Sequence, residues 1–186
     1  MPPTADDAIV DDAKQKHLEE LKSMSGDQLQ ARVAMAKENE AAQAREEEAK
    51  RVAREKAIAE YTAAAKAAFA AGSYAEAERC FDRVLTCHPE KPAEVVFNRA
   101  ACAFKMGRYA DAESDAAEAT YLEPSYVKAH YRLALAQQAL GKLERAQKAC
   151  RAALALEPSS PQLTALFAEL TKAADAEQQP TDGVLV

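Results

Sequence analysis

One pattern is written three times between Gly72 and Pro158, and it limits the possible fold more than any other feature of this 186-residue chain. Gly72, Gly107 and Gly141 stand 35 and 34 residues apart. Each glycine is followed five residues later by an alanine and seventeen residues later by a proline: Ala77, Ala112 and Ala146, then Pro89, Pro124 and Pro158. Apolar residues recur at helical spacing on both sides of each glycine, so each unit predicts a helical hairpin ended by proline.

These landmarks resemble the tetratricopeptide repeat, which keeps a glycine at the hairpin turn, an aromatic residue or leucine two residues on, and an alanine three residues later. The chain has Tyr74, Tyr109 and Leu143 at the second of these positions. The resemblance implies an all-α fold, a right-handed solenoid of three helical hairpins closed by a capping helix. The domain spans 58–174, with repeats at 58–91, 92–125 and 126–159 and the capping helix at 160–174.

Upstream of the repeats, the chain predicts a long charged helix over 27–57 that continues into the first repeat. No proline or glycine occurs from Asp27 to Ala71, and Ser25-Gly-Asp-Gln28 has the form of a capping box, as does Ser73-Tyr-Ala-Glu76 further on. Large aliphatic residues between Gln30 and Ala57 are limited to Val33, Met35 and Val52. Because they are too few for a sustained coiled-coil seam, a solvated single helix is favoured over a dimeric coiled coil.

The two ends of the chain predict little stable structure. Residues 1–26 form an acidic tail with two Asp pairs, where at most a short helix is expected around Asp11 to Met24. Such a helix would bury too little surface to be stable alone. Residues 175–186 are polar and are expected to be disordered.

Composition argues against several classes of function. The formal net charge of −6 disfavours nucleic acid as a partner. The sequence has neither a membrane-spanning apolar run nor a signal-peptide pattern, so we expect a cytoplasmic protein with no membrane contact. The cysteines lack metal or redox spacing, and no catalytic, phosphate-binding or metal motif occurs. We therefore expect neither an enzyme nor a cofactor.

Function is expected on the concave face, which stacked hairpins line with the first helix of each pair. Counting back from each turn glycine finds equivalent inner positions. These positions gather four cations, Lys66, Lys105, Lys128 and Arg132, against one acid, Glu94. They also hold the amide of Asn98 and the aromatic rings of Phe69 and Phe104. Cations beside an amide and apolar walls suit an extended acidic peptide with a free carboxylate.

This set resembles the carboxylate clamp of co-chaperone repeat domains, which holds the Glu-Glu-Val-Asp tail of the seventy- and ninety-kilodalton heat-shock proteins. The resemblance assigns the second- and third-repeat members of the clamp to Asn98, Lys105, Lys128 and Arg132. The first repeat departs from it, because Thr62 and Lys66 stand where the family has lysine and then asparagine. In the family that pair contacts the terminal main-chain carboxylate, so the departure either weakens binding or changes the preferred tail.

Two hypotheses follow. The first is a monomeric, co-chaperone-like adaptor whose basic groove binds acidic C-terminal tails, with a second protein partner engaged by the N-terminal helix. The alternative is a non-chaperone scaffold subunit whose groove holds a segment or helix of another protein.

Overall fold

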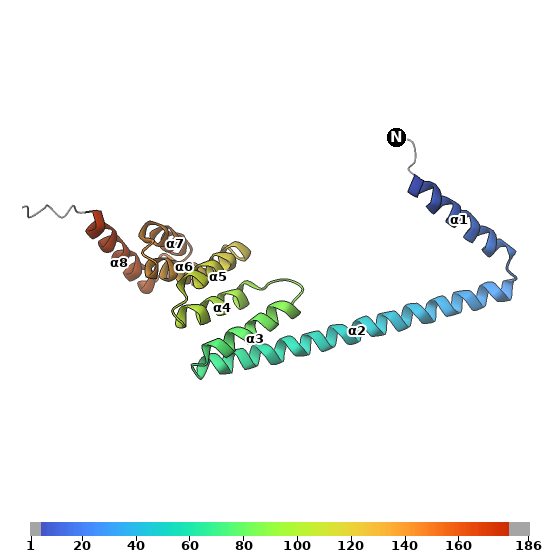
Figure 1. The fold of residues 1–186 in the computed structure, drawn as a ribbon, viewed down its shortest axis with the longest axis horizontal. Coiled ribbons are helices and arrows are strands. Elements are labelled where there is room, and N and C mark those ends of the chain that lie inside the picture. The colour runs from blue at the N-terminus through green and yellow to red at the C-terminus, as the bar shows by residue number, and fades with distance from the viewer. Residues whose placement is uncertain (1–4, 179–186) are drawn as a thin grey trace, which may run out of the picture. The chain divides into compact units, whose positions relative to one another are not determined.

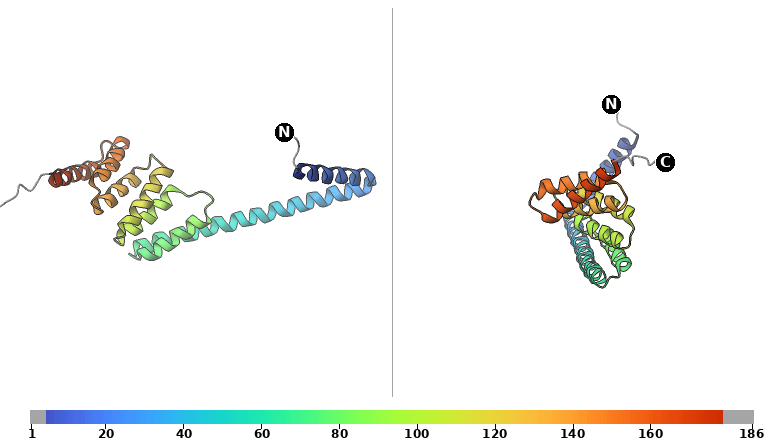
Figure 2. Two further views of the ribbon diagram at one scale, coloured as in Figure 1. Left: turned by 45° about the horizontal axis from the view of Figure 1, so that its top comes forward. Right: turned by 90° about the vertical axis from the view of Figure 1, so that its left-hand side faces the viewer.

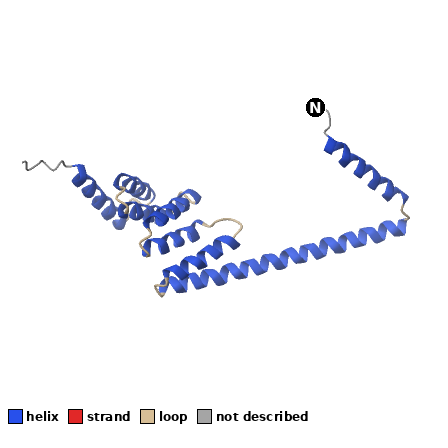
Figure 3. Cartoon of the chain, viewed as in Figure 1, coloured by secondary structure: helices blue, strands red, loops and turns tan. Residues whose placement is uncertain are grey.

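The computed structural model describes the backbone of residues 5–178 and the side chains of residues 14–176. Over the described range the chain forms helices joined by short turns, with no strand (Figure 3). It divides into two compact units, Met1–Val52 and Ala53–Val186, and the long helix α2 (Gly26–Ala70) contributes to both. No helix in the described part of the chain is long and apolar enough to cross a membrane.

The second unit is a stack of helical hairpins (Figures 1 and 2). The end of α2 pairs with α3 (Tyr74–Cys87), and the following helices are α4 (Ala93–Lys105), α5 (Tyr109–Leu122), α6 (Val127–Ala139), α7 (Leu143–Leu156) and α8 (Pro161–Gln178). Each helix from α3 to α8 packs on the next, and α4 also contacts α6. The predicted all-α architecture of hairpins with a capping helix and a long preceding helix is confirmed. The capping helix runs four residues past its predicted end, because Asp175 to Gln178 contains no helix breaker.

Each inner helix ends in the same hydrogen-bonded turn. Gly72, Gly107 and Gly141 have φ angles of 80°, 77° and 71°. At Gly107, its own N–H bonds to the Phe104 carbonyl at 3.0 Å, and the next N–H, of Arg108, bonds to the Ala103 carbonyl at 2.9 Å. The other two glycines repeat this pair of bonds. This is the Schellman arrangement, which satisfies otherwise unpaired carbonyls at the helix end.

Alanines let the helices of each pair approach closely. Ala77, Ala112 and Ala146 are fully buried, and so are Ala65 and Ala100 on the inner helices. Larger side chains such as Phe81, Val84, Val96 and Leu170 fill the remaining core. Burial raises the pKa of the Cys102 thiol to about 11, which keeps it protonated and consistent with a packing role.

The first unit consists of α1 (Ala5–Ser23) and the start of α2. The structure thus has a helix where the sequence predicts a disordered tail, because no proline or glycine interrupts residues 5–23. The predicted capping box at the start of α2 is confirmed: the Ser25 N–H bonds to Gln28 Oε1 at 2.9 Å, and the Gln28 N–H to Ser25 Oγ at 3.4 Å. From residue 30 to residue 56 every side chain is exposed, and Lys50 pairs with Glu46 at 2.9 Å.

The second predicted capping box is wrong. The Ser73 side chain makes no capping hydrogen bond, and its backbone lies at φ −81° and ψ 63°, outside the extended region that a capping residue favours. The Schellman turn fixes this geometry, because the Ser73 N–H already bonds to the Ala68 carbonyl at 2.9 Å.

Ion pairs tie the first two repeats together. Arg99 of α4 donates two hydrogen bonds to Asp115 of α5, at 2.8 and 2.7 Å, and a third to Asp82 of α3 at 3.0 Å. These bonds raise the pKa of Arg99. Arg108 likewise bridges Glu78 and Asp111. A planar guanidinium suits such multiple pairing.

We predict that Gly107→Ala lowers the free energy of unfolding by about 1 kcal/mol, because an L side chain is strained at this positive φ. A Cβ there would meet nothing within 4 Å, so the loss reports backbone strain alone. Urea unfolding measures the effect. Gly107→Asn is the control and should lose less, since asparagine tolerates this conformation. An alanine variant as stable as the wild type would contradict the argument.

We also predict that Arg99→Met lowers the free energy of unfolding by about 1–3 kcal/mol, because it leaves the half-buried Asp115 without its bidentate partner. Lys91→Met is the matched control, since Lys91 makes an exposed pair with Glu118 at 3.0 Å and should change stability by no more than about 1 kcal/mol. If both variants lower the free energy of unfolding equally in the same urea titration, the bidentate Arg99–Asp115 pair stabilises the fold no more than an exposed ion pair does.

Candidate peptide-binding site

The inner face is the surface lined by residues 58–70 of α2 together with α4 and α6. Two sets of contacts join its helices. A pocket connects α2, α3 and α4, and an arginine of α6 lies over rings of α4. The equal glycine offsets explain why predicted side chains from different repeats meet here, since each inner helix ends at the same turn.

The pocket between the first two repeats has a volume of about 200 Å³. Phe69, Ala70 and Phe81 give it an apolar lining, and Lys66, Glu94 and Asn98 supply its polar groups. Phe69 is held in place by an edge-to-face contact with Tyr74, with ring centroids 5.2 Å apart. The structure therefore brings together three of the predicted residues, Lys66, Phe69 and Asn98.

Arg132 is the most confined cation of the inner face. Its guanidinium carbon lies 5.6 Å from the Phe97 ring centroid and 5.3 Å from that of Phe104. Its Nε atom is buried without a hydrogen-bond partner, and burial lowers the pKa of the guanidinium. Phe104 is itself fixed against Tyr109 at 5.2 Å. Arg132 is thus positioned by cation–π contacts and lacks an anionic partner within the described residues.

The lysines of the inner face are also without partners. Across residues 14–176, Lys66, Lys105 and Lys128 are exposed and form no ion pair. By contrast, Arg99, Arg108 and Lys142 pair with carboxylates of neighbouring helices. The inner face therefore presents cations that remain available to an anionic ligand.

Within residues 14–176, three predicted residues form no hydrogen bond, ion pair or ring contact with the others. Thr62 is half-buried on α2, Lys105 is the last residue of α4, and Lys128 lies in the first turn of α6. The arrangement offers hydrogen bonds and charge to a bound chain. Within the described residues no group of three His, Cys, Asp or Glu side chains could hold a metal ion.

The structure adds two residues to the predicted set. Phe97 supports Arg132 and also contacts Tyr126 edge-to-face at 5.2 Å. Glu94 lines the pocket beside Lys66 and Asn98. Both occupy inner positions in the repeat register, but the sequence alone does not say that one supports a cation and the other borders a pocket.

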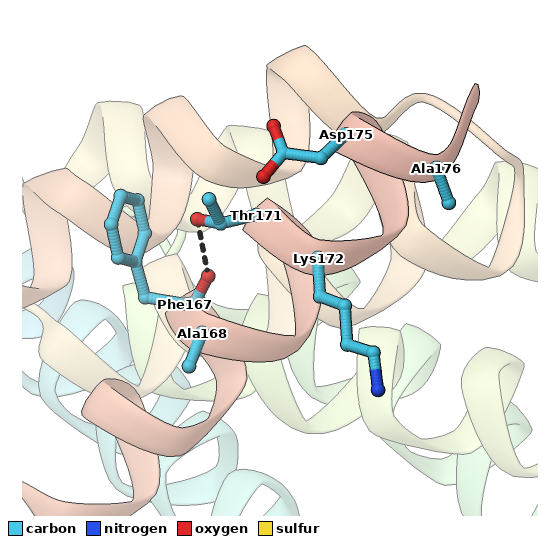
Figure 4. Close-up of a pocket in the computed structure, with 6 residues that line it drawn as sticks. All are labelled: Phe167, Ala168, Thr171, Lys172, Asp175 and Ala176. Atoms are coloured by element: carbon cyan, nitrogen blue, oxygen red, sulfur yellow. Dashed lines mark hydrogen bonds between the residues drawn. The ribbon is translucent and has the colours of Figure 1, made fainter. Parts of the chain in front are cut away.

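A larger hollow of about 640 Å³ lies over α8 and is lined by that helix alone (Figure 4). Its charged side chains are Lys172 and Asp175, and the Thr171 hydroxyl donates to the Phe167 carbonyl at 2.8 Å. None of the predicted binding residues reaches it. The hollow over α8 is therefore the weaker candidate for the binding site despite its larger volume. The predicted polar and apolar binding residues lie on the inner face instead.

Comparison with known protein domains places the repeats in a family. Models of the tetratricopeptide repeat match residues 62–125 and 127–160. The first repeat domain of Spaghetti (RPAP3), solved with the HSP90 peptide SRMEEVD, is 31% identical and superposes with a TM-score of 0.62, covering 64% of this chain and 94% of that domain. The second repeat domain of human RPAP3, solved with the HSP70 peptide SGPTIEEVD, is 28% identical with a TM-score of 0.60, covering 63% and 98%.

Curated relatives include the Hsp70-Hsp90 organizing protein of Triticum aestivum, 36% identical over 117 residues, and RNA polymerase II-associated protein 3 of Homo sapiens, 36% identical over 105 residues. The matches cover 63% and 56% of this chain but only 20% and 16% of those proteins. With both family models and a near-complete solved domain matching the same hairpins, the chain belongs to the tetratricopeptide repeat family.

Proposed function

We propose that this protein is a protein-interaction adaptor of the co-chaperone type, whose inner face binds acidic C-terminal tails ending in Glu-Glu-Val-Asp. The single observation that carries the proposal is Arg132, a half-buried cation held by two aromatic rings with no anionic partner in the described chain. An unpaired buried cation costs stability, and an incoming carboxylate would compensate it.

The rest of the inner face supports the same ligand class. Lys128 is one helical turn from Arg132, and Asn98 adds an amide from the neighbouring helix. The two solved neighbour domains carry heat-shock peptides that end in this motif, which favours chaperones of the seventy- and ninety-kilodalton classes as partners. The role proposed is binding without catalysis, in the cytoplasm, by the domain at 58–174 as a monomer.

The first repeat sets a limit on this proposal. Thr62 and Lys66 replace the lysine and asparagine of the family clamp, so the terminal carboxylate meets one cation, placed one helical turn later. Lys66 is exposed at the mouth of the pocket and remains a positive charge for that carboxylate. Binding through Lys66 would keep the charge but change the geometry of the clamp.

A second candidate function is that of a scaffold subunit, with the long helix as its assembly surface. One observation favours it: Val33, Met35 and Val52 are more than half exposed, on a helix whose side chains are all exposed from residue 30 to residue 56. A second protein partner on this segment would fit either candidate, because an adaptor also needs a surface beyond its peptide site.

Calorimetric titration with peptides ending Met-Glu-Glu-Val-Asp and Ile-Glu-Glu-Val-Asp tests the proposal. We expect dissociation constants on the order of micromolar, and a loss of at least about tenfold when the peptide is amidated or Arg132 is replaced by alanine. Arg151→Ala is the matched control, because Arg151 also lies over a ring, Phe167 at 5.4 Å, but outside the inner face. Absence of binding by the wild type, together with a stable self-association, would favour the scaffold function.

Arg132→Met separates binding from stability. We expect this variant to lose the acidic peptides while its free energy of unfolding stays within about 0.5 kcal/mol of the wild type or rises, because removal of an unpaired buried cation offsets the lost ring contacts. Thermal and urea unfolding measure stability on the same samples. A loss of more than about 1 kcal/mol would mean that Arg132 is a structural residue.

A further inference from the structure

The pocket between the first two repeats carries both signs of charge, which distinguishes it from the rest of the inner face. Lys66 of α2 and Glu94 of α4 line the same volume of about 200 Å³, with the Asn98 amide beside them and Phe69 and Phe81 in its lining. A purely anionic ligand matches only one of these two charges.

Glu94 is the single acid among the inner positions counted back from the turn glycines. It occupies the position equivalent to Ala59 in the first repeat and to Lys128 in the third. Its side chain is exposed and makes no ion pair in the described residues, although Lys66 lines the same pocket. Its carboxylate therefore remains available to a ligand.

Glu94 contributes to the electrostatic environment of Tyr126. Burial, followed by the negative charges of Glu94 and Glu123, raises the pKa of Tyr126. Tyr126 contacts Phe97, and Phe97 supports Arg132. Glu94 therefore lines the pocket from α4, the helix that also carries Phe97.

The pocket is complementary to a basic side chain. Lysine and arginine bury an aliphatic stem against apolar surface while the charged head stays near water or an anion. Here Phe69 offers such a surface, and Glu94 offers the anion at an exposed position. An aspartate or glutamate in the same place would face Glu94 as a like charge, which disfavours it.

Building on the proposed function, we infer that Glu94 is a specificity-determining residue: it makes this pocket accept a lysine or arginine of the bound tail and disfavour an acidic one. The preferred ligand is then a tail of mixed charge. Its carboxylates meet Arg132 and Lys128, and a basic residue nearby enters the pocket beside Glu94. Lys66 remains at the pocket mouth for a carboxylate of the same tail.

A lysine scan of the peptide Ile-Glu-Glu-Val-Asp, with each residue replaced in turn, tests this inference on the full-length chain. We expect at least one lysine-bearing peptide to bind the wild type about two- to fivefold more tightly than the parent. Glu94→Gln should abolish that gain and tighten binding of the parent peptide by a similar factor. Glu90→Gln is the charge-matched control, since Glu90 lies before α4 and does not line the pocket, and it should leave the ranking unchanged.

The outcomes distinguish failure of the role inferred for Glu94 from failure of peptide binding itself. Parent binding that needs Arg132, with a peptide ranking that Glu94→Gln does not alter, overturns the inference and leaves the proposed function standing. Failure of the parent and of all scanned peptides to bind the wild type overturns both. A tightening seen equally in Glu90→Gln also overturns the inference, because it reduces the role of Glu94 to net charge.

Discussion

The left-handed glycine at the end of each inner helix is the constraint on which the rest of this structure depends. Only a residue without a Cβ adopts φ angles near 71–80° without strain, and the paired bonds across the turn fix where the next helix starts. Five residues later a fully buried alanine sets how closely that helix approaches. The glycine turn and the buried alanine recur in every repeat at the same spacing. Residues at equal sequence distances from the glycines therefore lie on the same face of the domain. The inner face is a consequence of this register.

The arginines of the domain differ in how their charges are balanced. Arg99 and Arg108 saturate carboxylates of neighbouring helices, so their charges hold repeats together. Arg132 is held by rings alone, and burial lowers the pKa of its guanidinium without a carboxylate to offset the cost. Arg99 and Arg132 both lie on inner helices. The ion pairs of Arg99 stabilise the fold, whereas the burial of Arg132 without a carboxylate among the described residues costs stability. A residue retained at such a cost is a reasonable candidate for a binding role.

Features governed by local rules could be predicted from the sequence. The glycine turns, the buried alanines, the Ser25 capping box and the long helix each depend on residues close in the chain. The capping box predicted at Ser73 is wrong because the Schellman turn and the cap need different backbone geometries at this residue. The hydrogen bonds of the turn fix the geometry, and no cap forms. The Arg99 network and the rings around Arg132 were out of reach, since they depend on which rotamers meet across helices far apart in sequence. For the same reason Glu94 could be placed on the inner face but not beside Lys66.

The altered first repeat and Glu94 change the charge of the inner face in the same direction. Replacing the first-repeat lysine by Thr62 removes a cation from one end of the inner face, and Glu94 adds an anion beside the cation that remains. Lys128 and Arg132 keep the third-repeat end positive, with no acid among the inner positions of α6. The inner face therefore has a charge gradient along its length. A uniformly acidic tail would match one end of that gradient, whereas a tail of mixed charge would match both. Under the proposed function, the altered first repeat would therefore bear on which ligand is chosen as well as on how tightly it binds.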